Sequence, residues 1–307
     1  MTPSLPVDVD PHRFPIHHFE GRGFSQAYVH EGVGGTPVLL VHGWPETKRI
    51  YWRVIQPLVD AGFEVIVPDL RGFGDSDVAP DGFHDVASSS RDLEALVQSL
   101  GHRRIRVVGG DLGGPVIQDL ALRFPGLVES MVLFNAPLPV DREAMSHLVT
   151  LSTGAHDYFF RQGTDADALA RELGSPEERR RYIATFYSSR FWAHPGSFDD
   201  GAIAFQAEPF GDGARLRASF GAYESVFDRA RRSERPMLAV NPDVRTAILF
   251  GPSDHVISPD FDLMAAMVFP DHVGPFLLRD CGHFVPWEAP HALVSTITSL
   301  TGSAGSQ

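Results

Sequence analysis

Short, nearly unbroken runs of apolar residues recur along this chain and constrain its fold more than any other feature. They occupy residues 38–42, 64–68, 105–108, 131–134, 246–250 and 276–278. Runs of this length are typical of strands buried on both faces of a mostly parallel sheet. Helical spacing appears between them, as in residues 91–100, which end at Gly101, a residue suited to a left-handed helix cap. This alternation predicts an α/β fold with a mostly parallel central sheet flanked by helices.

Two segments depart from this alternation. Apolar and polar residues alternate within residues 14–31, which predicts an antiparallel ribbon at one edge of the sheet. Residues 137–242 are rich in Arg, Glu, Ala and aromatic residues with helical spacing, and they contain no clear strand. We therefore expect residues 1–136 and 243–307 to form the two parts of one α/β core, with residues 137–242 inserted as a helical cap (lid).

Composition narrows the functional classes. With 43% hydrophobic residues, the 307-residue chain is expected to be globular rather than disordered. A formal net charge of −13 has the wrong sign for a phosphate backbone, so no nucleic-acid partner is expected. The single cysteine, Cys281, allows no intrachain disulfide. The sequence shows neither a signal-peptide pattern nor the roughly 20 apolar residues that span a bilayer, so a cytoplasmic location without membrane attachment is expected.

The stretch VVGGDLGGP, residues 107–115, places a carboxylate between glycines where an apolar run meets a helical pattern. Asp111 could simply cap that helix. A dinucleotide loop does not fit, because Asp111 stands where the second glycine of G-x-G-x-x-G would fall. A nucleophile elbow fits better, since its sharp turn strains the central residue and requires tiny neighbours, here Gly109, Gly113 and Gly114. Asp111 is therefore the candidate nucleophile, in the place usually taken by Ser.

A carboxylate that attacks carbon forms an ester, and hydrolysis of the ester needs a base, an orienting acid and donors for the oxyanion. Where an elbow carries the nucleophile, the chain order is nucleophile, acid and then His. Asp254 follows the run at 246–250, and His283 follows the run at 276–278. Alone, Asp254 could be a turn residue, and His283 is one of 14 histidines. Their order after separate strands predicts a catalytic triad with Asp111.

The sequence HGWP, residues 42–45, follows the first run and supplies the rest of the candidate oxyanion hole. The donors would be the backbone N–H groups of Trp44 and Leu112, whose side chains need not be polar. A cis bond before Pro45 would aim the Trp44 N–H inward. The sequence DLRGFGDS at residues 69–76 is interpreted as a structural turn without chemistry.

Together, HGWP, DLRGFGDSD, GGDLGG, the G-x-x-D of residues 251–254 and GHFVPWE resemble the epoxide hydrolases of the α/β-hydrolase family over nearly the whole chain. The resemblance implies hydrolysis of an epoxide to a vicinal diol through an alkyl-enzyme ester on Asp111. It also implies two proton donors from the cap, because the leaving alkoxide is otherwise too basic. Tyr223 matches the second donor, although it could also be a packed aromatic residue.

Two residues compete for the first donor position. His156 aligns with it and is favoured, which departs from the usual pair of tyrosines, and Tyr158 lies two residues further on. Some family members place the acid after the strand at 131–134, but this chain has Asn135 there, so Asp254 remains the candidate acid.

The main alternative is a haloalkane or haloacid dehalogenase with the same Asp nucleophile. Haloalkane dehalogenases usually follow the nucleophile with Trp, and fluoroacetate-type enzymes place arginines next to it. This chain has Leu112 and Pro115 at those positions, which weakens both alternatives. A ligand-binding homologue without catalysis is disfavoured because all three candidate triad residues are present.

Aromatic residues of the expected cap predict a small hydrophobic epoxide as the substrate, with water as the second reactant. The candidate lining residues are Phe159, Phe160, Phe186, Trp192 and Phe220. No clustered His and Cys spacing suggests a metal, and the resemblance implies no cofactor. The sequence leaves open which epoxide is used, the regio- and stereochemistry, and whether the chain forms a homodimer.

Overall fold

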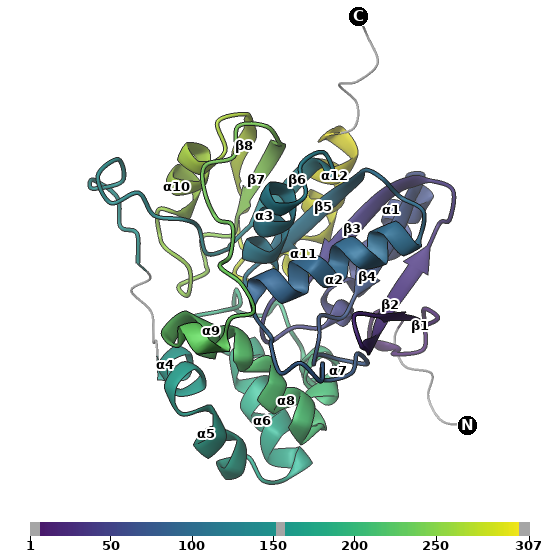
Figure 1. The fold of residues 1–307 in the computed structure, drawn as a ribbon, viewed down its shortest axis with the longest axis vertical. Helices are drawn as coiled ribbons and strands as arrows, with labels where there is room; N and C mark the ends of the chain where they lie inside the picture. The colour runs from purple at the N-terminus through teal and green to yellow at the C-terminus, as the bar shows by residue number, and fades with distance from the viewer. Residues whose placement is uncertain (1–6, 152–156, 301–307) are drawn as a thin grey trace, which may run out of the picture.

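The computed structural model describes residues 7–151 and 157–300, and a single sheet lies at its centre (Figure 1). The eight strands lie in the order β1-β2-β4-β3-β5-β6-β7-β8. They are β1 (His17–Gly21), β2 (Phe24–Glu31), β3 (Thr36–Val41), β4 (Phe63–Pro68), β5 (Ile105–Gly110), β6 (Val128–Phe134), β7 (Arg245–Phe250) and β8 (His272–Leu277). Strands β3 to β8 pair in parallel, whereas β1 and β2 form an antiparallel edge. The expected α/β fold is confirmed.

Helices cover both faces of this sheet. Helices α1 (Trp52–Asp60) and α12 (Pro290–Leu300) pack together on one face, and α2 (Val86–Ser99) and α3 (Gly113–Arg123) pack together on the other (Figure 1). The remaining helices of the core are α10 (Phe261–Val268), α11 (Val285–Glu288) and the 3-10 helices η1 (Val7–Val9) and η2 (Lys48–Tyr51). Within the described residues, no helix is both long and apolar enough to cross a bilayer.

The starts of α2 and β8 lie furthest ahead of those that the sequence pattern predicts. Helix α2 begins at Val86 because the Asp85 carboxylate caps it, accepting the Ser88 N–H at 2.7 Å. Strand β8 begins at His272, which pairs with Thr246 of β7. The β8 side chains are half-buried or exposed, so the start of this edge strand carries no apolar run. Gly101 has a φ of 87°, as expected for a left-handed helix cap.

Between β6 and β7 the chain leaves the sheet and forms a layer of helices beneath it in the view of Figure 1. They are α4 (Asp157–Thr164), α5 (Ala166–Glu172), α6 (Pro176–Tyr187), α7 (Asp200–Ala207), η3 (Glu208–Gly211), α8 (Gly213–Ser219), α9 (Gly221–Phe227) and η4 (Arg229–Arg231). The described residues of this stretch contain no strand. The limits of the cap at residues 137 and 242 stay a prediction.

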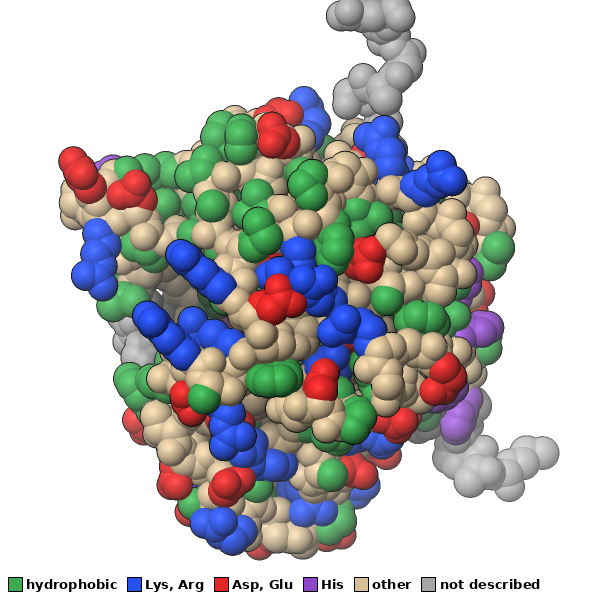
Figure 2. Space-filling model, viewed as in Figure 1, with side chains coloured by type: hydrophobic (Ala, Val, Ile, Leu, Met, Phe, Trp, Pro, Cys, Tyr) green, Lys and Arg blue, Asp and Glu red, His purple; other side chains and the backbone are tan. Residues whose placement is uncertain are grey.

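Basic side chains gather on the face of the molecule shown in Figure 2. Part of this charge is neutralised by Glu234, which follows η4 and pairs with Arg91 of α2 and Arg123 of α3. These ion pairs tie the end of the inserted stretch to the helices that cover the sheet.

The parallel strands bring the candidate site together. Asp111 follows β5, Asp254 follows β7 and His283 follows β8. Because the carboxyl ends of parallel strands lie at the same edge of a sheet, the loops that carry these residues converge there. This edge faces the inserted helices (Figure 1).

Candidate active site

The turn between β5 and α3 holds Asp111 in a strained backbone conformation. Asp111 has a φ of 42°, in the left-handed region that non-glycine residues rarely adopt. The turn also needs glycine beside it, because a Cβ on Gly113 would lie 2.3 Å from the Val41 carbonyl oxygen. Leu112 occupies the cap position of α3 and makes no side-chain cap bond. The geometry is that of an elbow, and the alternative in which Asp111 caps the helix is wrong.

The Asp111 carboxylate is held by two different groups. Its Oδ1 accepts the backbone N–H of Trp44 at 2.7 Å. Its Oδ2 lies 3.2 Å from Nε2 of His283. The peptide bond between Trp44 and Pro45 is cis, as expected. The residue is 9% exposed, so both contacts lie in a largely dry environment.

The His283 imidazole lies between two carboxylates. Its Nδ1 lies 2.8 Å from Oδ2 of Asp254, and both side chains are buried. Burial lowers the pKa of His283, but the charges of Asp254 and Asp111 outweigh burial and raise that pKa well above its usual value. With Asp111 ionised, the imidazole is therefore held in its charged form.

Asn135 connects the nucleophile turn to the acid loop, a contact that sequence reasoning missed. Its carbonyl oxygen accepts the Asp111 N–H at 2.9 Å. Its Nδ2 donates to Oδ2 of Asp254 at 2.8 Å, and its Oδ1 accepts the Gly251 N–H at 2.9 Å. The position of Asn135 directly after β6 could have indicated this contact, because it places a polar side chain at the same edge of the sheet as Asp111 and Asp254.

Glu46 is a second residue that the sequence did not single out. It is buried beside the elbow, and its Oε2 accepts the Gly43 N–H at 2.5 Å. Burial raises its pKa to about 7, although the positive charge of His283 opposes the rise. A carboxylate directly after HGWP was the signal that could have identified it.

Two tyrosines of the inserted helices face the elbow. The Tyr158 ring stacks on Trp44 at 5.6 Å, and the Tyr223 ring meets the same indole edge-on at 5.6 Å. The two phenol rings are 6.0 Å apart. Burial, followed by the charge of Asp111, raises both phenol pKa values well above their usual value. Both phenols therefore stay protonated at neutral pH. His156 lies outside the described residues.

Aromatic rings close the site, but not all of those expected to do so. The Phe186 ring packs on Trp44 at 4.8 Å, and the Trp192 ring packs on His283 at 4.7 Å. Phe159 packs against Tyr223 at 5.6 Å. Phe220 is fully buried, and its carbonyl oxygen accepts the Tyr223 N–H at 3.0 Å.

The structure does not place Phe160 at the site. Its side chain is 54% exposed, and its ring contacts Phe159 and Phe227. Two positions along a helix correspond to a rotation of about 200°, so Phe160 points away when Tyr158 of α4 points inward.

The turn at residues 69–76 makes hydrogen bonds and ion pairs that support the fold, as the sequence predicted. The carboxylate of Asp69 accepts the backbone N–H of Lys48 at 2.8 Å, and the Lys48 ammonium group pairs with both Asp69 and Asp75. In residues 7–151 and 157–300, no group of three or more His, Cys, Asp or Glu side chains could hold a metal ion.

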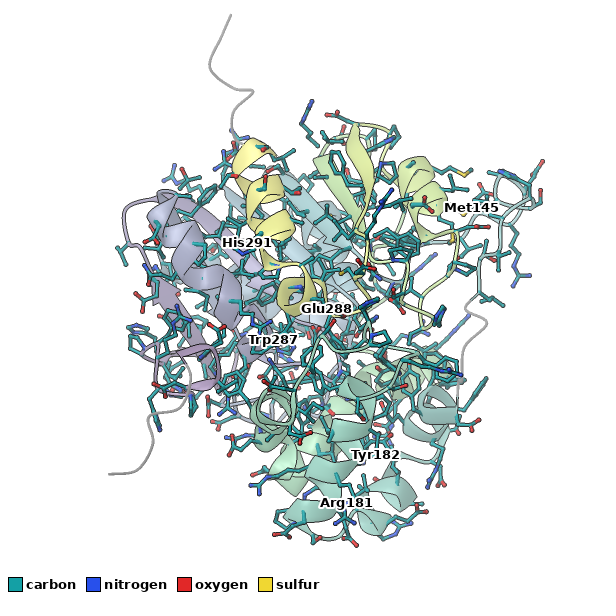
Figure 3. All side chains as sticks on the ribbon, turned by 180° about the vertical axis from the view of Figure 1, so that it is seen from behind. Met145, Arg181, Tyr182, Trp287, Glu288 and His291 are labelled. Carbon is teal, nitrogen blue, oxygen red and sulfur yellow. The ribbon has the colours of Figure 1, made fainter. Side chains whose placement is uncertain are left out.

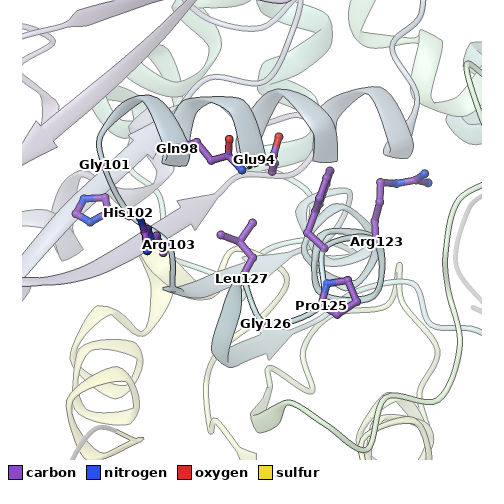
Figure 4. A pocket seen from close by; sticks show the side chains of 10 residues that line it. Glu94, Gln98, Gly101, His102, Arg103, Arg123, Pro125, Gly126 and Leu127 are labelled. Atoms are coloured by element: carbon purple, nitrogen blue, oxygen red, sulfur yellow. Dashed lines mark hydrogen bonds between the residues drawn. The ribbon is translucent and has the colours of Figure 1, made fainter.

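A surface groove lies away from these residues (Figure 4). It is lined by Glu94, Gln98, Gly101, His102, Arg103, Arg123, Phe124, Pro125, Gly126 and Leu127. Its loops precede β5 and β6, at the edge of the sheet opposite Asp111. None of the candidate site residues lines it, so we assign it no part in the chemistry.

Comparisons with known proteins agree with this fold. The sequence pattern of the α/β hydrolase fold matches residues 36–290. The soluble epoxide hydrolase of Corynebacterium sp. (strain C12) is 28% identical over 284 residues, which cover 89% of this chain and 92% of that protein. Haloalkane dehalogenase 2 of Mycobacterium tuberculosis (strain ATCC 25618 / H37Rv) is 28% identical over 309 residues, which cover 97% of this chain and 100% of that protein. The ligand-free structure of the epoxide hydrolase CorEH has a TM-score of 0.77 at 22% identity, covering 93% of this chain and 98% of that one.

Proposed function

Because this chain belongs to the α/β hydrolase fold family, we propose that it hydrolyses an epoxide to a vicinal diol through an ester on Asp111. One observation carries the proposal. A buried carboxylate at an elbow lies between the Trp44 N–H and the His283 imidazole, and two protonated phenols face the same indole. The soluble epoxide hydrolase of Corynebacterium, which is similar over most of both chains, supports the same activity.

In the first step, Asp111 attacks an epoxide carbon. The Trp44 N–H holds Oδ1, which leaves Oδ2 to form the bond. The ring C–O bond breaks, and the oxygen takes a proton from Tyr158 or Tyr223. We assign Tyr158 rather than His156 as the first donor, because its ring stacks on Trp44 beside Tyr223. The phenolate then recovers a proton that His283 supplies, so the hydroxyalkyl ester is neutral.

Ester formation also changes His283 from an acid to a base. At 3.2 Å, the attraction between the imidazolium and Asp111 is about 5 kcal/mol for an effective dielectric constant near 20. Loss of the Asp111 charge on ester formation therefore lowers the pKa of His283 and favours release of its proton. Neutral His283, oriented by Asp254, can then accept a proton from water.

In the second step, that water adds to the ester carbonyl carbon of Asp111. The Trp44 N–H already bonds the oxygen that becomes the oxyanion, and the Leu112 N–H is the second proposed donor. Collapse of the tetrahedral intermediate breaks the bond to the substrate oxygen, which takes the proton of the added hydroxyl group, and the diol is released. The carboxylate of Asp111 and the charged His283 are restored, so protons balance over the cycle.

Dehalogenation is the second candidate, since the similar haloalkane dehalogenase 2 covers nearly the whole chain. The contacts of this site favour it less. The residue after the nucleophile is Leu112, which has no side-chain donor for a halide, and the Trp44 indole N–H donates to Ser219 at 3.2 Å. Two phenols suit an epoxide oxygen better, because an alkoxide needs a proton and a halide does not.

Product analysis separates these candidates. The purified chain is incubated with aryl and alkyl epoxides, and with haloalkanes of matched carbon skeleton. We expect diol from the epoxides and little halide release. Halide release without diol formation would assign the chain to the dehalogenases, and the absence of both products would contradict the proposed function. The aromatic rings of Phe159, Phe186 and Trp192 lead us to expect the highest activity on hydrophobic epoxides.

A further inference from the structure

A segment of the inserted stretch crosses both loops that carry the candidate acid and base. Residues 191–197, here called the strap, lie in the connection between α6 and α7. The Trp192 carbonyl oxygen in the strap accepts the His283 N–H at 2.7 Å. The Phe191 carbonyl oxygen accepts the N–H of His255, the residue after Asp254, at 2.9 Å. The strap therefore bonds the backbone of the His283 loop and of the Asp254 loop.

Glu288 fastens the same strap to the His283 loop. This partly buried carboxylate lies at the end of α11, at the junction between the core and the inserted helices (Figure 3). Its Oε2 accepts the His194 N–H at 2.8 Å and the Ser197 hydroxyl at 3.1 Å, both from the strap.

The other contacts of Glu288 reach both neighbours of His283. Its Oε2 also accepts the Gly282 N–H at 2.9 Å, and its Oε1 accepts the Phe284 N–H at 2.9 Å. The His283 N–H between them donates to the Trp192 carbonyl oxygen. Three consecutive N–H groups of this loop therefore donate to Glu288 or to the strap.

Close packing adds to these hydrogen bonds. A Cβ on Gly282 would lie 2.4 Å from the Trp192 carbonyl oxygen, so glycine is required for the strap to approach the loop this closely. On the acid side, Nδ1 of His194 lies 3.1 Å from the Ser253 hydroxyl, next to Asp254. The strap thus contacts the flanking residues of both Asp254 and His283.

We propose that the strap and Glu288 position the His283 imidazole for the second step, so that the inserted helices help to set the rate of ester hydrolysis. The inference rests on the proposed function. His283 removes the proton from water, and a general base must lie within hydrogen-bond reach of that proton. Glu288 acts through the backbone at His283 and is a positioning residue. Weakening the hydrogen bonds of Glu288 should slow the second step more than the first, in which Asp111 is the nucleophile.

The test is the Glu288→Gln variant, with Glu177→Gln on the exposed side of α6 as the matched control. Both carboxylate oxygens of Glu288 accept backbone N–H groups. Glutamine replaces one of these oxygens with an N–H₂ group, which then faces a backbone N–H, and two donors cannot bond to each other. Rapid quenching and mass measurement of the Asp111 peptide give the rates of ester formation and ester hydrolysis. We expect about tenfold slower ester hydrolysis, the effect of one disrupted hydrogen bond, and ester formation within about twofold of the parent. The control should show neither change.

A merely structural role would lower the amount of folded enzyme without changing the fraction that carries ester at steady state. Ser197→Ala removes only the hydroxyl contact with Glu288, and it should also raise the fraction of enzyme that carries ester. This variant tests the inference if Glu288→Gln fails to fold. Folded Glu288→Gln or Ser197→Ala with an unchanged ester fraction would overturn the inference.

A second readout does not depend on the substrate. The proton on Nδ1 of His283, shared with Asp254, should give a low-field NMR signal. We expect that signal to shift or broaden in Glu288→Gln and to stay unchanged in Glu177→Gln. An unchanged signal in Glu288→Gln would count against the strap. Absence of ester in the parent, with the signal altered in Glu288→Gln, would contradict the proposed function while supporting the positioning of His283.

Discussion

Nε2 of His283 lies 3.2 Å from Oδ2 of Asp111, so the candidate base contacts the candidate nucleophile directly. The contact links the two halves of the proposed reaction. While Asp111 is an anion, it keeps the imidazole charged, and once Asp111 is an ester that stabilisation is lost. In the proposed reaction, the protonation state of His283 therefore follows the covalent state of Asp111.

Replacing the base should separate the two steps. In His283→Gln, Asp111 can still attack the epoxide, but no side chain activates water. We expect turnover to fall by about 10⁴-fold or more, since members of a triad act as a unit. Intact-mass measurement after mixing with substrate should show the ester at close to one per chain. Fast turnover by the folded variant would remove His283 from the mechanism.

The two phenols should act in ring opening. Tyr158→Phe and Tyr223→Phe each remove a proton donor and keep the aromatic packing on Trp44. We expect each to slow ester formation by about 10²-fold, a typical contribution of general acid catalysis. Tyr182→Phe is the control, because its hydroxyl bonds to Gln162 rather than facing Trp44.

The control variant should differ from the parent by less than about threefold. Loss of activity in Tyr223→Phe but not in Tyr158→Phe would return the first donor role to another residue, with His156 the next candidate. This comparison is made most directly from the rate of the first turnover, before ester hydrolysis limits the signal.

Titration of His283 should depend on Asp111. In the parent, the raised pKa keeps the imidazole charged at neutral pH. Asp111→Asn removes one of the two negative charges that oppose burial, so the pKa of His283 should fall. NMR titration of the imidazole in both proteins measures the change. Equal pKa values would show that Asp111 does not control the protonation of His283.

The same contacts predict how stability varies with pH. The pKa of His283 in the folded chain lies above its unfolded value of about 6.5. Its ion pairs therefore stabilise the fold fully below that pH, and the contribution is lost as pH rises through the raised folded pKa. Urea unfolding should show the parent losing more free energy of unfolding than His283→Gln between pH 6 and strongly alkaline pH. Parallel curves would contradict this.

Asn135 should support the acid and the nucleophile together. Asn135→Ala leaves Asp254 without one donor and the buried Gly251 N–H without an acceptor. We expect the free energy of unfolding to fall by about 1–3 kcal/mol, the usual effect of unpaired buried polar groups. We also expect slower ester hydrolysis, because Asp254 is less firmly held. Urea unfolding and single-turnover rates test both, and a variant equal to the parent in each would exclude this role.

The sequence predicted the sheet and the meeting of Asp111, Asp254 and His283, because each follows a strand and parallel strands end at one edge. Glycines around Asp111 also identified the elbow, since backbone strain limits which residues fit there. These features are local, and a single sequence shows them.

Contacts between distant segments could not be read in the same way. Asn135 meets Asp254 across 119 residues, and Glu288 meets His194 across 94. Neither pairing leaves a pattern within either segment. The orientation of Phe160 was wrong for a related reason, since the face that α4 turns inward depends on its packing against Trp44 rather than on its own periodicity.

A single turnover in water enriched in heavy oxygen tests the covalent route most directly. Excess enzyme is mixed with an epoxide that it hydrolyses, and the peptide that contains Asp111 is weighed after digestion. Attack of water on the ester carbonyl predicts heavy oxygen in the Asp111 carboxylate, with unlabelled oxygen passing to the first diol. Heavy oxygen in the diol alone would show that water attacks the epoxide directly, and would contradict the ester on Asp111.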